Sequence, residues 1–199
     1  MEPRPERRVC LVGMPGVGKS AVGRRCAAYL EVPFVDLDAA VEAELGMSIA
    51  DCFAKMGEDR FRRIEADKAA ELLRRTGGYV LATGGGAVLD PGTRDLMRTH
   101  AITVWLRARV ETLSNRTSRN RHRPLLAGAE SEESRRSLLE RLVDQRSHLY
   151  AEVAQVTLDT DAWGTDELAR QVWAAVGGRL PGAVGGRSGT VGHEGSGDG

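Results

Sequence analysis

The chain has 199 residues, a length typical of one domain with its own core. Its 28 basic residues balance its 28 acidic ones, which argues against a protein that binds nucleic acid or a membrane surface in bulk. Three cysteines without a C-x-x-C spacing favour reduced, buried side chains in a cytosolic protein over metal ligands or disulfides. With no apolar run of about 18 residues and no signal peptide behind the start MEPRPERR, we expect a soluble cytoplasmic domain without a membrane span.

Strand and helix patterns alternate along the chain. Short apolar runs predict strands, and apolar residues four positions apart predict helices. We expect strands at 8–12, 33–36, 79–82, 102–106 and 153–159, and helices at 19–30, 39–45, 49–56, 58–75, 91–98, 110–117, 132–149 and 165–176. This order predicts an α/β fold with a mostly parallel sheet, helices on both faces, and ligands at the carboxyl ends of the strands.

The composition changes at residue 177. Residues 177–199 contain 10 of the 24 glycines and little that a core could bury. Such a segment is typical of a disordered tail. We therefore expect a single domain at 1–176, followed by this tail.

Residues 13–20 read GMPGVGKS, a complete G-x-x-x-x-G-K-[ST] motif between an expected strand and an expected helix. In such a loop the backbone N–H groups and the helix N-terminus surround phosphate oxygens, Lys19 reaches the β- and γ-phosphates, and Ser20 binds Mg²⁺. A chance match is improbable in a chain with only three lysines. The residues expected to contact the nucleotide are Gly13, Met14, Pro15, Gly16, Val17, Gly18, Lys19, Ser20 and Ala21.

The second expected strand ends in VDLD, which places Asp36 and Asp38 near the phosphate loop if the two strands share a sheet. Residues i and i+2 of a strand point the same way, so both carboxylates could face a cleft. The alternative is that Asp38 caps the helix expected at 39–45.

Arg62 and Arg63 lie early in the helix expected at 58–75, in the stretch MGEDRFRRIEAD. An arginine fork binds a carboxylate through two hydrogen bonds. The stronger alternative from these residues alone is a solvated helix face with i,i+4 ion pairs. The acidic residues that would form it are Glu58, Asp59, Glu65 and Asp67.

Four arginines lie between Arg116 and Arg123, in and just before the loop SRNRHRPLLAG. Crowded positive charge on a loop favours an arriving anion, so we expect a mobile lid at about 115–129 that closes over ATP. A nucleic-acid-binding loop is the weaker alternative, because no aromatic residue lies among the arginines.

The stretch VLATGGGAV places three adjacent glycines after an expected strand. Each costs roughly 0.5–1 kcal/mol relative to alanine, because glycine loses more backbone freedom on folding. Three together predict that something comes very close to the backbone at Gly84, Gly85 and Gly86.

Six stretches resemble the shikimate kinases, small P-loop kinases of aromatic amino-acid biosynthesis: GMPGVGKS, FVDLD, SIADCFAKMGEDRFRRIE, ATGGGAV, RPLLAG and QRSHLY. They occur in the order and spacing of that family over residues 8–176. The resemblance implies a five-stranded parallel sheet of the nucleoside-monophosphate-kinase type. It also implies transfer of the γ-phosphoryl group of ATP, with Mg²⁺, to the 3-hydroxyl of shikimate.

The resemblance also implies residue roles. Asp38 would accept a hydrogen bond from the attacking hydroxyl, and Asp36 would hold Mg²⁺ through water beside Ser20. Lys19 and the lid residue Arg123 would stabilise the transferring phosphoryl group.

For the acceptor, the resemblance implies that Arg62 and Arg146 clamp the shikimate carboxylate from two sides. The other residues implied to contact the acceptor are Phe53, Phe61, Gly84, Gly85 and Gly86.

Around the adenine, the resemblance implies that Arg116 lies over the base. Many members of the family carry an arginine after the last strand that covers the adenine, whereas this chain has Trp163 in that stretch. Trp163 is either part of the core or a substitute surface on which the adenine packs. Arg119 and Arg121 could share the role of Arg123.

Two other functions stay open from the residues alone. One is phosphorylation of another small metabolite, such as gluconate, on the same fold. The other is a degenerate ATP-binding module that serves a partner protein. The balanced charge and the lack of a long apolar stripe are compatible with a monomer, which we expect.

Overall fold

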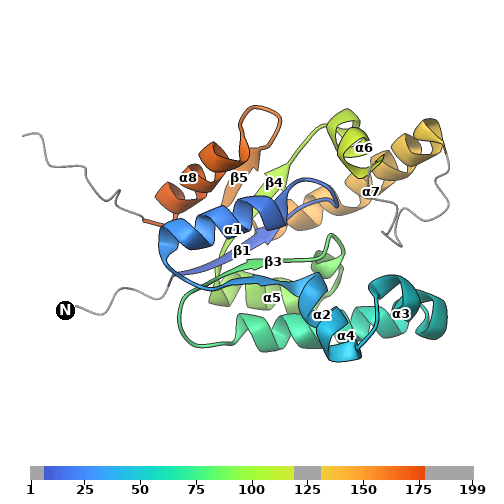
Figure 1. Cartoon of the computed structure of the whole chain (residues 1–199), viewed down its shortest axis with the longest axis horizontal. Helices are drawn as coiled ribbons and strands as arrows, with labels where there is room; N and C mark the ends of the chain where they lie inside the picture. Colours follow the sequence, from blue (N-terminus) through green and yellow to red (C-terminus); the bar gives the residue numbers. More distant parts are fainter. Residues whose placement is uncertain (1–6, 119–130, 178–199) are drawn as a thin grey trace, which may run out of the picture.

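The computed structural model describes residues 7–118 and 131–177 of the chain (Figure 1). Five parallel strands form one sheet there, in the order β2-β3-β1-β4-β5. This arrangement confirms the predicted α/β class and the five-stranded parallel sheet. The strands are β1 (Arg8–Val12), β2 (Phe34–Asp36), β3 (Tyr79–Ala82), β4 (Ile102–Arg107) and β5 (Val156–Asp159).

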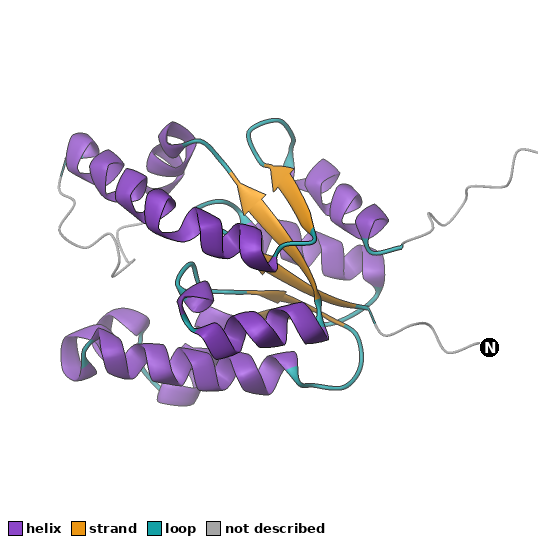
Figure 2. Ribbon diagram, turned by 180° about the vertical axis from the view of Figure 1, so that it is seen from behind, coloured by secondary structure: helices purple, strands orange, loops and turns teal. Residues whose placement is uncertain are grey.

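Helices cover both faces of the sheet (Figure 2). Helices α1 (Lys19–Leu30) and α8 (Thr165–Ala175) pack side by side on one face, and α5 (Pro91–His100) and α7 (Glu132–Val153) lie on the other. Near the β2 edge the chain forms a group of three helices that packs against α5, and α6 packs against α7. The group consists of α2 (Leu37–Leu45), α3 (Ile49–Met56) and α4 (Glu58–Leu73), while α6 spans Val110–Ser118.

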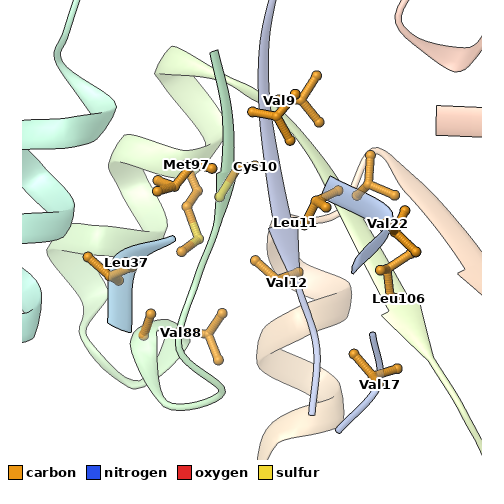
Figure 3. Packing of buried hydrophobic residues seen from close by; sticks show 14 of the residues in the cluster. Val9, Cys10, Leu11, Val12, Val17, Val22, Leu37, Val88, Met97 and Leu106 are labelled. Atoms are coloured by element: carbon orange, nitrogen blue, oxygen red, sulfur yellow. The ribbon is translucent and has the colours of Figure 1, made fainter. Parts of the chain in front are cut away.

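The core is built around β1, the central strand. Residues 9–12 are completely buried, because a parallel strand covered on both faces has no solvent side (Figure 3). The three cysteines Cys10, Cys26 and Cys52 are unpaired and buried, as predicted. Burial raises the pKa of the Cys10 and Cys26 thiols to about 12, so both are inert packing residues.

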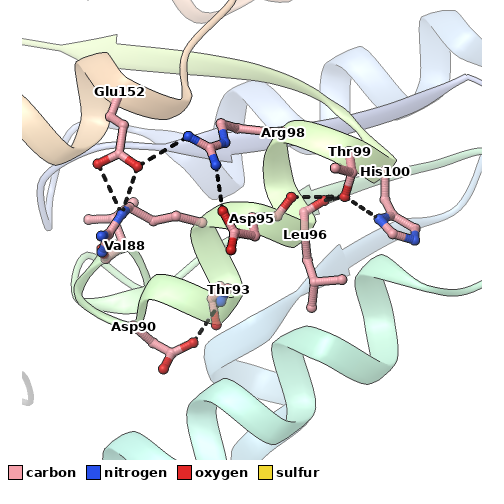
Figure 4. Close-up of polar contacts among 10 residues, drawn as sticks. Val88, Asp90, Thr93, Asp95, Leu96, Arg98, Thr99, His100 and Glu152 are labelled. Carbon is pink, nitrogen blue, oxygen red and sulfur yellow. Dashed lines mark hydrogen bonds and ion pairs between the residues drawn. The ribbon is translucent and has the colours of Figure 1, made fainter.

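A polar cluster on α5 fixes the short 3₁₀ helix η1 (Ala87–Leu89) that follows the glycine triplet (Figure 4). Asp90 caps α5 by accepting a hydrogen bond from the Thr93 N–H at 2.6 Å. Arg94 donates to the Val88 carbonyl at 2.8 Å and pairs with Glu152 of α7 at 3.1 Å. The backbone just beyond the triplet is thereby tied to two helices.

The structure corrects several predicted boundaries. Helix α2 begins at Leu37, two residues early, because Asp36 caps it by accepting the Ala39 N–H. Helix α7 continues through Val153, where the sequence analysis began the last strand. An apolar valine suits either element, and it lies here on the buried face of α7, three residues after Tyr150. Helix α4 ends two residues early, at Leu73, and η1 was not predicted.

Two predictions concern parts of the chain outside the described residues. The lid expected at about 115–129 falls largely within 119–130, which includes Arg119, Arg121 and Arg123, and the tail falls within 178–199. Both stay predictions. Across residues 7–118 and 131–177, no helix combines the length and the apolar character needed to cross a bilayer.

Candidate active site

A cavity of about 530 Å³ opens among the segments that follow β1, β2 and β3. These strands are neighbours, with Leu11 and Asp36 both in register with Ala82, so their carboxyl ends meet at one edge of the sheet. Helices α2, α3 and α4 supply the far wall. The lining residues are Pro15, Gly16, Gly18, Lys19, Ser20, Ala21, Asp36, Asp38, Glu42, Ile49, Phe53, Phe61, Arg62, Glu65, Thr83, Gly84, Gly85, Gly86 and Arg116.

The predicted phosphate loop joins β1 to α1. Gly13, Gly16 and Gly18 have φ values of 140°, 83° and 109°, which residues with a Cβ rarely adopt. A Cβ on Gly13 would also lie 2.2 Å from the Leu106 carbonyl oxygen. The Lys19 ammonium donates to the Gly13 carbonyl at 2.8 Å, so the loop curves around its own lysine.

Not every residue of the predicted phosphate loop lines the cavity. Pro15, Gly16, Gly18 and the residues at 19–21 do, whereas Gly13, Met14 and Val17 are buried behind them. Those three shape the loop and contribute backbone.

Ser20 and Asp36 meet at the edge of the cavity, as predicted from sequence. The Ser20 hydroxyl donates to Asp36 Oδ2 at 2.6 Å, which joins the start of α1 to the end of β2. A hydroxyl and a carboxylate are hard oxygen ligands of the kind Mg²⁺ prefers. Within the described ranges no group of three or more His, Cys, Asp or Glu residues could hold a metal by itself.

Asp38 lines the cavity, but for a different reason from the one predicted. It belongs to the first turn of α2 and not to the strand, and the helix cap is Asp36. Asp38 therefore does not share a strand face with Asp36 and does not cap the helix, so both predictions for its position were wrong. The turn of α2 carries the Asp38 carboxylate to Gly84, where a Cβ would lie 2.7 Å from its Oδ1.

Glu65 is a site residue that the sequence analysis missed. Its side chain is 4% exposed and pairs with Arg62 at 2.7 Å, while Arg62 also pairs with Glu58 at 2.9 Å. Arg62 thus forms the intrahelical ion pairs of the alternative interpretation, and it also lines the cavity. The binding of a ligand carboxylate by Arg62 stays a prediction. In the sequence Glu65 looked like one more acidic residue of a solvated face, and only the packing of α4 against η1 and α5 distinguishes it.

The aromatic pair predicted from the resemblance packs beneath Arg62. The rings of Phe53 and Phe61 lie 4.8 Å apart between centroids, and the Arg62 guanidinium lies 5.9 Å and 5.3 Å from them. Cations over aromatic faces gain electrostatic attraction. The rings therefore help to hold the guanidinium at the cavity wall.

Side chains of the protein itself occupy the space that a Cβ at any of the three glycines would need. A Cβ on Gly84 would lie 2.4 Å from Glu65 Oε1, and a Cβ on Gly86 would lie 2.2 Å from the Arg62 guanidinium. A Cβ on Gly85 would lie 2.7 Å from the ring of Pro15 in the phosphate loop. None of the three has a positive φ, so the requirement is space and not backbone conformation.

Arg146 lies on α7 behind the triplet. It is 4% exposed, donates to the Gly85 carbonyl at 3.1 Å, and is not among the residues that line the cavity. Its Nε–H is buried without a hydrogen-bond partner in the described part of the chain. The prediction that Arg62 and Arg146 flank one ligand carboxylate is not tested by this arrangement.

Arg116 borders a second, smaller cavity of about 170 Å³ beside the phosphate loop. Its guanidinium donates to the Thr160 hydroxyl at 2.9 Å and to the Val17 carbonyl at 3.2 Å, which fixes α6 against the segment after β5. Trp163 lines the same cavity and is 52% exposed. That exposure rules out the alternative in which Trp163 belongs to the core.

The pKa of Glu65 is shifted by its surroundings. Burial raises the pKa of its carboxyl, and the nearby Asp38 carboxylate acts in the same direction, while Arg62 and Arg146 oppose the shift. Two carboxyl groups crowded beside Gly84, with two arginines close by, make this end of the cavity a polar pocket of mixed charge.

A five-stranded parallel sheet with a glycine-rich phosphate loop after its central strand defines a P-loop nucleotide-binding protein, and the polar pocket beside the loop is typical of a phosphotransferase. A model of the shikimate kinase family matches residues 15–176. A shikimate kinase of Paramagnetospirillum magneticum is 46% identical over 155 residues, which cover 78% of this chain and 77% of that protein. The chain belongs to the shikimate kinase family.

Solved structures agree with this assignment. The shikimate kinase of Acinetobacter baumannii in complex with shikimate has a TM-score of 0.81 and 35% identity, covering 86% of this chain and 93% of that one. A gluconokinase of Sinorhizobium meliloti has a TM-score of 0.56 and 20% identity, covering 87% and 93%. That second likeness shows the fold alone.

We predict that Glu65→Gln becomes more stable relative to the wild type as the pH rises. Because the pKa of Glu65 is raised in the folded state, the folded protein retains a proton that the unfolded chain releases above about pH 4.5. The free energy of unfolding of the wild type should therefore fall as the pH rises through the raised pKa, and the change to a neutral amide removes this loss. Urea denaturation between about pH 4 and 8 measures the difference.

The matched control is Glu140→Gln, a change at a half-exposed glutamate on α7. This control removes a carboxyl that is not buried, so it should lack the gain in relative stability with rising pH that we expect for Glu65→Gln. If the Glu65→Gln and wild-type curves run parallel, burial of the carboxyl does not shift its pKa.

Proposed function

We propose that this protein transfers the γ-phosphoryl group of ATP to the 3-hydroxyl of shikimate, giving ADP and shikimate 3-phosphate. Membership of the shikimate kinase family and the likeness to a solved shikimate complex support this reaction. The single observation that carries it is that one cavity joins the phosphate loop to the pocket of Arg62, Asp38 and the glycine triplet. Donor and acceptor can then meet within it.

The nucleotide phosphates are proposed to occupy the phosphate loop. Glycines with positive φ allow successive backbone N–H groups of such a loop to converge on phosphate oxygens, and the start of α1 adds partial positive charge. Phosphoryl transfer proceeds through a loose transition state, so positioning and charge neutralisation dominate catalysis. We assign the neutralising charge to Lys19 and to Arg123, which lies in the predicted lid.

Mg²⁺ is proposed to bind beside Ser20 and Asp36, the latter through water. The 2.6 Å contact between their oxygens brings two suitable ligands together at the edge of the cavity. When bound, the ion would neutralise charge on the β- and γ-phosphates.

The acceptor is proposed to lie against the glycine triplet. Asp38 orients the 3-hydroxyl of shikimate. The oxygen of this hydroxyl forms a bond to the γ-phosphorus as the bond between that phosphorus and the β-phosphate oxygen breaks. The hydroxyl proton passes to Asp38. An aspartate is a weak base for an alcohol, so the proton leaves late. Arg62 binds the carboxylate from the cavity wall, and Arg146 binds it from behind the triplet. The buried Nε–H of Arg146, which has no hydrogen-bond partner among residues 7–118 and 131–177, supports its share.

The adenine is proposed to lie in the smaller cavity between Arg116 and Trp163. An exposed indole beside a fixed guanidinium offers a flat apolar surface and a cation to a planar base. Trp163 thereby replaces the arginine that covers the adenine in many members of the family.

Monomeric state and cytoplasmic location belong to the same proposal. The lack of a long apolar stripe is compatible with a monomer, and three buried, unpaired cysteines support a reducing compartment. Light scattering of the purified protein checks the monomeric state.

The proposed reaction is tested by ADP release with ATP and Mg²⁺, comparing shikimate, gluconate, a nucleoside monophosphate and no acceptor. We expect ADP with shikimate only. Turnover with gluconate instead would favour the other small-metabolite kinase, and ATP binding without turnover on any acceptor would favour the ATP-binding module.

We predict that Asp38→Asn lowers kcat by two or more orders of magnitude and changes the affinity for ATP by less than about twofold. The amide cannot take the hydroxyl proton, while the phosphate loop is untouched. Asp95→Asn, at an exposed position on α5, is the control and should behave as wild type. A kcat close to the wild-type value in Asp38→Asn would remove the role assigned to Asp38.

We predict that Trp163→Ala raises KM for ATP about tenfold, because stacking of a base on an aromatic side chain contributes roughly 1–3 kcal/mol. Trp163→Phe keeps a ring and should restore most of the affinity, and KM for shikimate should stay unchanged in both variants. Steady-state kinetics with each substrate varied measure this. Equal ATP affinity in the alanine and phenylalanine variants would contradict this role of Trp163.

A further inference from the structure

The carbonyl of Gly85 accepts two long-range hydrogen bonds from α7. The Tyr150 hydroxyl donates to it at 2.6 Å and the Arg146 guanidinium at 3.1 Å, from positions one helical turn apart. The other two carbonyls of the triplet are satisfied locally, since Gly84 and Gly86 accept from N–H groups of η1. Gly85 is therefore the point at which the triplet is attached to a helix on the face of the sheet.

The Tyr150 side chain contacts β4, the phosphate loop and the glycine triplet. Its ring is 1% exposed and stacks on Trp105 of β4, with centroids 5.9 Å apart. Its hydroxyl oxygen lies 3.8 Å from the Met14 sulfur in the phosphate loop. Gly85, its hydrogen-bond partner, faces Pro15 of the same loop so closely that no Cβ would fit between them.

The hydroxyl keeps its donor role across the usable pH range. Burial raises the pKa of Tyr150 to about 12, so the phenol stays protonated. Three consecutive glycines have no side chains with which to hold a position of their own. The carbonyl contacts from α7 therefore determine where the middle of the triplet lies relative to the phosphate loop.

We propose that Tyr150 is a positioning residue for phosphoryl transfer: through Gly85 it sets the spacing between the phosphate loop and the acceptor pocket and orients Arg146. This inference rests on the proposed function, because it assigns the acceptor to that pocket. Tyr150 acts through Gly85 and Arg146, and it touches neither reacting group.

The structure offers a matched control for the removal of one buried tyrosine hydroxyl. Tyr79 is 5% exposed and donates to the Leu73 carbonyl at 3.0 Å. Burial raises its pKa to about 12 as well. It begins β3, at the end of the strand opposite the cavity, so Tyr79→Phe deletes the same kind of hydrogen bond without touching the site.

The test compares Tyr150→Phe, Tyr79→Phe and the wild type in steady-state kinetics with ATP and shikimate, well below each melting temperature. We expect the two variants to lose similar amounts of thermal stability. Only Tyr150→Phe should lower kcat, by about tenfold or more, since small displacements of reacting groups cost large factors in rate. It should also raise KM for shikimate several-fold, because the Gly85 carbonyl to which Arg146 donates loses its second donor, and leave KM for ATP within about twofold.

The inference would be overturned if Tyr150→Phe had the kcat and the shikimate KM of the wild type, or if Tyr79→Phe showed the same kinetic losses. It would also be overturned if Tyr150→Phe alone failed to fold, because the hydroxyl would then be needed for stability and not for positioning. Failure of the proposed function is recognised separately. In that case the wild type itself releases no ADP with shikimate, and the inference is lost with the function.

Discussion

The parallel pairing of β1 with β3 is the constraint on which the rest of the site depends. It brings two glycine-rich segments, far apart in the sequence, to the same edge of the sheet. Thr83 reinforces the join, since its N–H and its hydroxyl both donate to the Leu11 carbonyl at 3.1 Å. The register of β2 against β3 then adds Asp36 at the same level. A shift of one residue in the pairing of β1 with β3 would move the phosphate loop along the glycine triplet, and a shift in the pairing of β2 with β3 would move Asp36 away from Ser20.

Crowding around the triplet shows how the site trades stability for geometry. Glu65 and Asp38 both approach Gly84, and Arg62 occupies the space that a side chain on Gly86 would need. The buried carboxyl group of Glu65 and three consecutive glycines are each unfavourable for folding. Their cost is offset by the ion pair with Arg62, by the hydrogen bonds that Gly85 accepts, and by the large apolar core around β1. Fixed, closely spaced polar groups are what a positioned phosphoryl transfer requires.

The features predicted well from sequence are those encoded locally. The phosphate loop, the position of Asp36 near it and most element boundaries follow from the glycine-rich motif, the helix caps and the apolar periodicity. The errors lie where two elements compete for the same residues. Val153 suited a strand or a helix, and the packing of α7 decided for the helix. Asp38 reached the cavity from a helical turn and not from a strand, because Asp36 took the capping role. Glu65 gave no signal, since one acidic residue of a charged helix looks like another.

The sequence by itself determined the fold class, the nucleotide-binding loop and the family, because each depends on residues close together in the chain or on the order of short motifs. Only the tertiary structure decided why the triplet must be glycine, which acidic residue joins the site, and how Tyr150 attaches Gly85 to α7. These are contacts between segments separated by tens of residues. Their distances are set by strand register and helix packing, which no local pattern records.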